Sequence, residues 1–89
     1  MRKVVCLLRD EVATTFGTPV TFESTDFAIR SFGDLLSDGS TLPGKHPADF
    51  ALYKIAEYDD VTGDLFPCDR VVISRGSDFN FGNNNKDNN

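Results

Sequence analysis

The 89-residue sequence has no tryptophan, only two cysteines and a single histidine. Cys6 and Cys68 lie far apart and form no CxxC pair, so neither a disulfide scaffold nor a zinc site of the usual spacing is indicated. Long apolar runs are also lacking, because two basic and five apolar residues precede Arg9, too few for a signal-peptide core or a membrane span. We therefore expect a cytosolic protein with no membrane partner, reduced thiols and a buried Cys6.

Positive charge is scarce as well. Nine lysines and arginines face fourteen acidic residues, which gives a net charge of −5. Proteins that hold nucleic acid mainly by neutralising phosphates show the opposite balance. A role on DNA would therefore need a local basic patch, base stacking or a protein intermediary. The length of 89 residues indicates one domain, and the hydrophobic share of 39% lies in the globular range. A core this small is commonly supplemented by pairing, so we expect a homodimer.

Apolar periodicity predicts an α+β fold, a mostly antiparallel sheet of four or five strands in the order β-β-α-β-β with one helix on a face. The strands are expected at 3–9, 19–24, 49–59 and 69–74, the helix at 24–39, loops at 10–18 and 37–47, and a turn at 59–64. We place the domain at 1–75. The Asn-rich segment 76–89 is predicted to be a disordered tail, from which Phe79 and Phe81 could dock on the domain.

The helix has recognisable ends and one apolar stripe. Ser24 or Thr25 is suited to cap its N-terminus, and Gly39 to end it in a left-handed conformation. Gly33 inside the helix costs about 1 kcal/mol relative to alanine, which suggests close packing against a strand. The stripe consists of Ala28, Phe32, Leu35 and Leu36.

Two polar motifs invite a chemical interpretation. His46 could act as a base or metal ligand, yet no HxxxH, CxxC or Ser/His/Asp arrangement accompanies it, so it is better explained as the entry to a strand. The acids at 59–64 resemble a calcium loop, but counting back from Gly63 puts Tyr58 at the first ligand position. A hairpin turn with positive φ at Gly63 fits better. We expect no enzyme, no metal and no cofactor.

A few cations near tyrosines form a candidate surface for single-stranded nucleic acid, which proteins hold by stacking bases on aromatic rings flanked by positive charge. The candidates are Arg9, Lys45, Tyr53, Lys54, Tyr58 and Arg70. Regular alternation puts Lys54 and Tyr58 on one strand face with Phe50, Leu52 and Ala56. Alternatively, the aromatic residues are core and the cations only aid solubility.

The spacing of several motifs resembles a known family, the small nonstructural protein of gokushoviruses, which are tailless single-stranded-DNA phages of the microvirus group. The resemblance covers about residues 19–67 and joins a helix motif, a Lys-His-Pro loop, an aromatic strand and an acidic turn. The matching positions are Ala28, Arg30, Phe32 and Asp34; Lys45, His46 and Pro47; Phe50, Leu52 and Tyr53; and Tyr58, Asp59, Asp60, Thr62 and Gly63.

This resemblance implies a phage protein made in the cytoplasm of the infected bacterium, absent from the mature virion and associated with single-stranded DNA. It implies a role in the switch from genome replication to single-strand synthesis and packaging, with phage replication or procapsid proteins as partners. The alternative is an adaptor or scaffold that binds a capsid, replication or host protein through its acidic surface without touching DNA.

Overall fold

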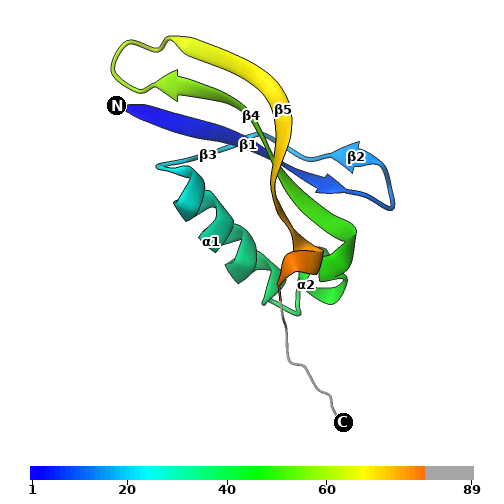
Figure 1. The fold of residues 1–89 in the computed structure, drawn as a ribbon. Coiled ribbons are helices and arrows are strands. Elements are labelled where there is room, and N and C mark those ends of the chain that lie inside the picture. The colour runs from blue at the N-terminus through cyan, green and yellow to red at the C-terminus, as the bar shows by residue number, and fades with distance from the viewer. Residues whose placement is uncertain (80–89) are drawn as a thin grey trace.

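The computed structural model describes residues 1–79. Its centre is a five-stranded antiparallel sheet in the order β2-β1-β4-β5, in which β3 also pairs with β1 (Figure 1). The strands are β1 (Arg2–Asp10), β2 (Thr15–Phe16), β3 (Val20–Phe22), β4 (Phe50–Asp59) and β5 (Leu65–Arg75). The predicted α+β class, with its antiparallel sheet and one main helix, is confirmed.

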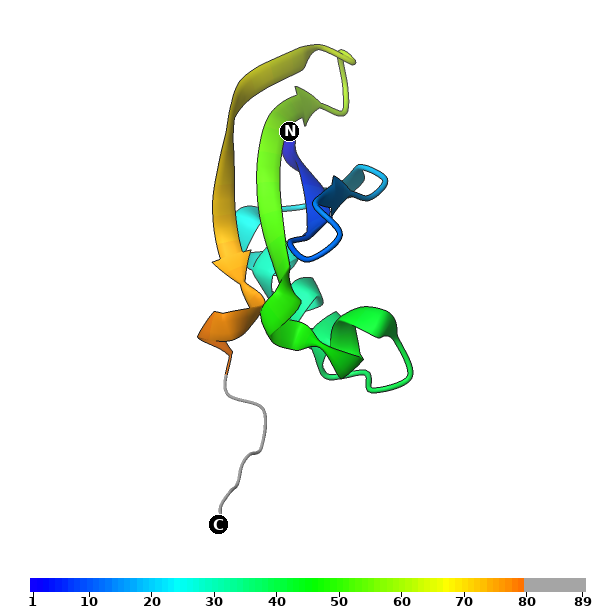
Figure 2. The same ribbon diagram turned by 90° about the vertical axis from the view of Figure 1, so that its right-hand side faces the viewer.

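One helix of three turns covers one face of this sheet. The helical elements are α1 (Thr25–Leu36), the single-turn α2 (Leu42–Lys45), and the 3-10 turns η1 (Pro47–Asp49) and η2 (Gly76–Asp78). Figure 2 shows the strands in front and α1 behind them. Within residues 1–79, no helix lies over the face of the sheet that is turned away from α1.

Sequence-based expectations for α1 hold at its start and fail at its end. The Ser24 side chain caps the helix by accepting a hydrogen bond from the Phe27 N–H at 3.1 Å. The helix ends at Leu36, and Ser37 at the C-cap keeps right-handed geometry with its N–H bonded back into the last turn. The left-handed end expected at Gly39 is therefore wrong; among the glycines of residues 1–79, the one with positive φ is Gly63 in the hairpin turn, as predicted.

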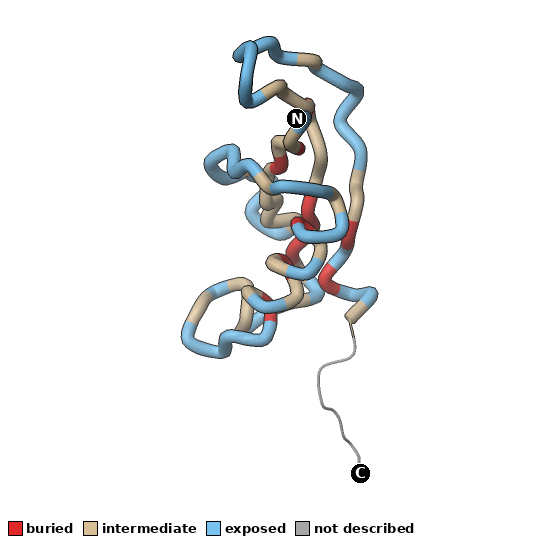
Figure 3. Tube along the Cα trace, turned by 90° about the vertical axis from the view of Figure 1, so that its left-hand side faces the viewer, coloured by how far each residue is buried: buried red, intermediate tan, exposed pale blue. Residues whose placement is uncertain are grey.

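The core lies between α1 and the facing side of β1 and β4. Its buried members are Val4, Cys6, Ala28, Phe32, Leu36, Phe50 and Leu52, and the tube in Figure 3 shows such buried positions inside the molecule. Cys6 is fully buried, as predicted, and this burial raises the pKa of its thiol. Cys68 lies exposed on β5, and both cysteines are free thiols.

Short elements occupy both segments that were predicted to be loops. Thr15 and Phe16 form β2, which pairs with the end of β1, and α2 and η1 lie within the second loop. These loop predictions are wrong because isolated pairs and single turns leave no periodic pattern. The segment predicted as a tail begins with η2, and Phe79 packs edge-on against Phe32 at 5.8 Å between ring centres. Phe81 and the rest of 80–89 lie outside the described residues.

An irregularity in β4 changes which side chains share a face. Cys6 pairs with Lys54 and Val5 with Ala56, so Ile55 is an extra residue in β4 and forms a bulge. Side chains beyond a bulge exchange faces relative to regular alternation. Lys54 consequently lies on the α1 side with its partner Cys6, and Tyr58 lies on the opposite side with its partner Lys3. The prediction that Lys54 and Tyr58 share a face is wrong.

Candidate nucleic-acid interface

Two arginines and two aromatic rings gather on the sheet face that α1 does not cover. We call Arg9, Phe16, Tyr53 and Arg70 the arginine–aromatic cluster. The Phe16 ring lies at its centre, with the Arg9 guanidinium carbon 4.7 Å and that of Arg70 5.2 Å from the ring centroid. Tyr53 meets Phe16 edge-on at 5.3 Å between centroids, and Arg70 is also 5.9 Å from the Tyr53 ring. Three of the six residues predicted from sequence are thus brought together.

Strand pairing explains this gathering. Arg9 lies opposite Phe16 in the β1–β2 pair, and Leu7 lies opposite Tyr53 in the β1–β4 pair. Arg9 and Leu7 are two residues apart on β1 and so share a face, while Cys6 and Leu8 alternate with them and point toward the core. Side chains that are distant in sequence therefore meet on the open side of the sheet.

Glu11 is the acidic neighbour of this cluster. Its carboxylate accepts a hydrogen bond from Arg9 Nε at 2.5 Å, lies 3.9 Å from the Arg75 guanidinium, and is 3.5 Å from the Tyr53 hydroxyl. Glu11 therefore neutralises part of the local positive charge and holds Arg9 in place. An incoming phosphate would have to compete with this carboxylate for Arg9.

The other three predicted residues lie elsewhere. Lys54 is on the α1 side of the sheet, where its ammonium group donates to Glu57 at 2.6 Å. This hydrogen bond and a second one from Arg2 lower the pKa of Glu57. Tyr58 is on the open face but five residues farther along β4 than Tyr53, about 16 Å at the usual rise per residue. Lys45 lies exposed on α2.

Phe16 is the residue that sequence reasoning missed. Its segment reads as a loop because β2 has only two residues, which show no alternation. A signal does exist: Phe16 is a large apolar side chain between a threonine and a glycine, and such a residue commonly needs a packing partner. Only the pairing of β2 with β1 identifies that partner as the Arg9 and Tyr53 side of the sheet.

The exposure of the cluster suits it to contact a ligand. Arg70 is exposed and belongs to no ion pair within residues 1–79, so its charge is available. Phe16 and Tyr53 are half-buried, so each ring presents only part of its surface. Rings and guanidinium planes stack with bases irrespective of sequence, and free guanidinium groups bind phosphate. This chemistry suits a flexible, unpaired strand.

The described part of the chain was also searched for membrane-spanning helices and for clusters of metal-ligating side chains. No helix in residues 1–79 combines the length and the apolar character needed to cross a membrane. Within the same residues, no three histidine, cysteine, aspartate or glutamate side chains gather in a way that could hold a metal ion.

Comparison with known proteins identifies the family. Residues 3–79 match the model of the family described as Phage ORF5 protein, and since this is most of the chain, the protein belongs to that family. It is therefore a phage protein. No curated protein and no solved structure matches the chain.

Proposed function

We propose that this phage protein is a non-enzymatic, nonstructural protein that associates with single-stranded DNA in a gokushovirus-like phage. It acts in the host cytoplasm during the switch from genome replication to single-strand synthesis and packaging, and is not part of the mature virion. The observation that carries the proposal is the arginine–aromatic cluster on the open sheet face. Membership of a phage family supports the setting, and the gokushovirus motifs support the specific role.

Charge limits how the protein holds DNA. With a net charge of −5, nonspecific attraction to phosphates is weak overall, so stacking on Phe16 and Tyr53 supplies much of the affinity. Arg70 adds one phosphate contact, and Arg9 contributes less because Glu11 occupies it. Single-stranded DNA fits this arrangement better than duplex DNA, whose bases are not free to stack.

A binding titration tests the proposal. Fluorescence anisotropy with a labelled oligothymidine should show binding at low salt that weakens moderately as salt rises. Arg70→Ala should weaken binding and lower the slope of affinity against salt by about one unit. Phe16→Ala should cost about 1–3 kcal/mol per stacked base. Arg30→Ala, on the solvent side of α1, is the matched control and should leave the affinity unchanged. Absence of binding at low salt would refute the proposal.

Glu11 offers a test in the opposite direction. Glu11→Gln removes the carboxylate that competes with phosphate for Arg9, so it should strengthen binding to the same oligonucleotide. Glu57→Gln, which removes an equal charge on the other side of the sheet, is its control. Equal gains from both variants would mean that only net charge matters and that the cluster is not the contact surface.

The predicted homodimer is retained as part of this proposal. β5 is an edge strand of eleven residues, and an edge strand presents unpaired backbone groups to another chain. Leu65 and Val71 on this strand are 61% and 48% exposed. Sedimentation equilibrium at several concentrations should give the mass of a dimer. A monomer mass at all concentrations would refute the proposed homodimer.

The adaptor alternative also has one specific observation in its favour. An apolar groove opens between α1 and the β1–β3 edge, away from the arginine–aromatic cluster. Such a groove is suited to a protein segment and not to a phosphate backbone.

A further inference from the structure

Two arginines flank one small residue on the open face of the sheet. Arg9 of β1 lies opposite Ala51 of β4, and Arg75 of β5 lies opposite the same alanine. Paired residues of neighbouring strands share a face and lie about 5 Å apart, so the two arginines start about 10 Å apart with only a methyl group between them. Like charges placed in this way repel each other, and an anion between them relieves the repulsion.

The Glu11 carboxylate is that anion. Its Oε1 accepts a hydrogen bond from Arg9 Nε at 2.5 Å, and its Oε2 lies 3.9 Å from Nη1 of Arg75. The Tyr53 hydroxyl donates to the same Oε2 at 3.5 Å. Three donors from three different strands therefore converge on one small anion.

Glu11 is held by its backbone and not by burial of its side chain. Its N–H donates to the Asp49 carbonyl oxygen at 2.8 Å. The turn that follows is held by the Asp10 carboxylate, which accepts hydrogen bonds from the N–H groups of Val12 and Ala13. The Glu11 side chain is 35% exposed. Rotation about its side-chain bonds is therefore enough to clear the space between the arginines, with no change in the fold.

The charges of this site suit a phosphate better than a carboxylate. Arg9 and Arg75 carry two positive charges, of which Glu11 neutralises one. A phosphate monoester carries a charge of about −1.5 to −2 at neutral pH and has three strong acceptor oxygens, one for each donor. We propose that Arg9, Arg75 and the Tyr53 hydroxyl form a phosphate subsite. Glu11 occupies it in the free protein, and a terminal phosphate of a single-stranded nucleic acid displaces Glu11 on binding.

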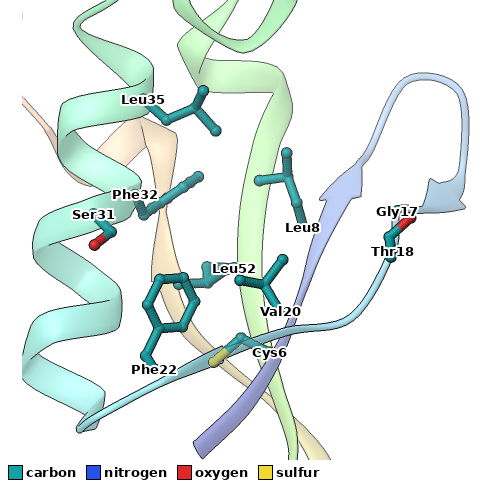
Figure 4. A pocket seen from close by; sticks show the side chains of 10 residues that line it. All are labelled: Cys6, Leu8, Gly17, Thr18, Val20, Phe22, Ser31, Phe32, Leu35 and Leu52. Atoms are coloured by element: carbon teal, nitrogen blue, oxygen red, sulfur yellow. The ribbon is translucent and has the colours of Figure 1, made fainter.

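This subsite rests on the proposed association with single-stranded DNA and adds which part of the strand is recognised. Arg9 contacts both the Phe16 ring and the Glu11 carboxylate, so a base stacked at this ring brings its phosphate within reach of the subsite. The apolar groove shown in Figure 4 plays no part in it. That groove is lined on β1 by Cys6 and Leu8, which point to the opposite side of the sheet from Arg9.

Fluorescence anisotropy with short, internally labelled oligothymidine tests the ligand. One strand carries a phosphate at its 5′ end, a second carries it at its 3′ end, and a third has hydroxyl groups at both ends. We expect one of the phosphorylated strands to bind about threefold or more tightly than the third. Equal binding of all three would overturn the proposal. Inorganic phosphate should bind more weakly than the preferred strand, and equal affinity would overturn the assignment to a nucleic acid.

Protein variants locate the subsite. Arg75→Ala should remove the preference for the phosphorylated strand and leave the unphosphorylated strand bound. Arg2→Ala is its matched control, because Arg2 is 55% exposed against 53% for Arg75 and also pairs with one glutamate, Glu57, outside the cluster. Tyr53→Phe keeps the ring and removes the hydroxyl, so it should reduce the preference without weakening the unphosphorylated strand. Equal losses from Arg75→Ala and Arg2→Ala would overturn the proposal, since only net charge would then matter.

Salt dependence tests the displacement of Glu11. Neutralising one phosphate of a single strand releases counterions and changes the slope of log affinity against log salt by about −0.7. In the wild type, the displaced Glu11 carboxylate attracts counterions in its turn and offsets part of this release. Glu11→Gln should therefore steepen the slope for the phosphorylated strand by up to about 0.7, whereas Glu57→Gln should leave it unchanged. Equal slopes in the wild type and Glu11→Gln would overturn the displacement, with circular dichroism to verify folding.

These outcomes separate the subsite from the association with DNA. If the strand with two hydroxyl ends binds and a terminal phosphate adds nothing, the association stands and the subsite is refuted. If no strand binds at low salt, both are refuted.

Discussion

The contact between Gly33 and Phe79 allows a sharp test of where the folded domain ends. A Cβ added to Gly33 would lie 2.9 Å from Cε1 of the Phe79 ring. Gly33 is expected from the sequence to pack closely against a strand. That prediction is wrong, because its close neighbour is the Phe79 ring, which follows β5 and η2 in sequence. Replacing Gly33 by alanine has two opposed effects on stability, and Phe79 decides between them.

The magnitudes follow from the geometry. Alanine in a helix interior is more stable than glycine by about 1 kcal/mol. To reach an ordinary contact of 3.4 Å, the Phe79 ring must withdraw by 3.4 − 2.9 = 0.5 Å, which weakens its edge-on packing on Phe32. Such a gap forfeits a quarter or more of the contact energy, and an aromatic pair contributes about 0.5–1.5 kcal/mol beyond burial. In the wild-type background, Gly33→Ala should therefore give little or no net stabilisation.

In the Phe79→Ala background, the same substitution should stabilise by the full helix-propensity gain of about 1 kcal/mol. Urea unfolding of the four proteins gives the coupling energy, which we expect to be about 1 kcal/mol. Arg30→Ala, on the exposed side of α1, provides an additive control in both backgrounds. Equal effects of Gly33→Ala in the two backgrounds would refute the reasoning, because Phe79 would then not pack on the helix.

Three further predictions concern stability. Leu36→Ala should cost about 3 kcal/mol in urea unfolding, because Leu36 is only 2% exposed; a cost below about 1 kcal/mol would contradict its place in the core. Gly76→Ala should cost about 2 kcal/mol or more, since a Cβ there would lie 1.7 Å from the Pro47 carbonyl oxygen; a neutral effect would contradict this contact. Lys54 and Arg2 lower the pKa of Glu57, so their stabilisation is present above the ordinary carboxylate pKa and is lost as the pH falls through the lowered value. Glu57→Gln should therefore destabilise at neutral pH and not in strong acid, and parallel urea midpoints at all pH values would count against this.

Sequence pattern located the long elements, although β5 begins at Leu65, four residues before the predicted strand. The apolar run at the start of β1, the stripe of α1 and its Ser24 cap, and the turn around Gly63 all express local preferences that the fold retains. Local patterns fail where pairing decides the outcome. β2 is a strand because it pairs with β1, and its two residues show no pattern that predicts this pairing.

In the candidate site, too, residue type was predictable from the sequence, whereas strand pairing was not. Residue types alone selected Arg9, Tyr53 and Arg70, which meet around Phe16. The proposed pairing of Lys54 with Tyr58 failed because it assumed regular alternation through Ile55. A bulge adds one residue to one strand of a pair. Its position therefore depends on the register between the two strands and cannot be predicted from the sequence of one strand alone.

The separation of charge in the fold changes what the net charge of −5 implies. Averaged over the chain, that charge argues against binding to DNA phosphates. Alternation along β1 supplies Arg9 to the open face, and Cys6 and Leu8 to the apolar groove beside α1. A DNA strand would therefore meet the arginines of the open face, despite the acidic average of the chain.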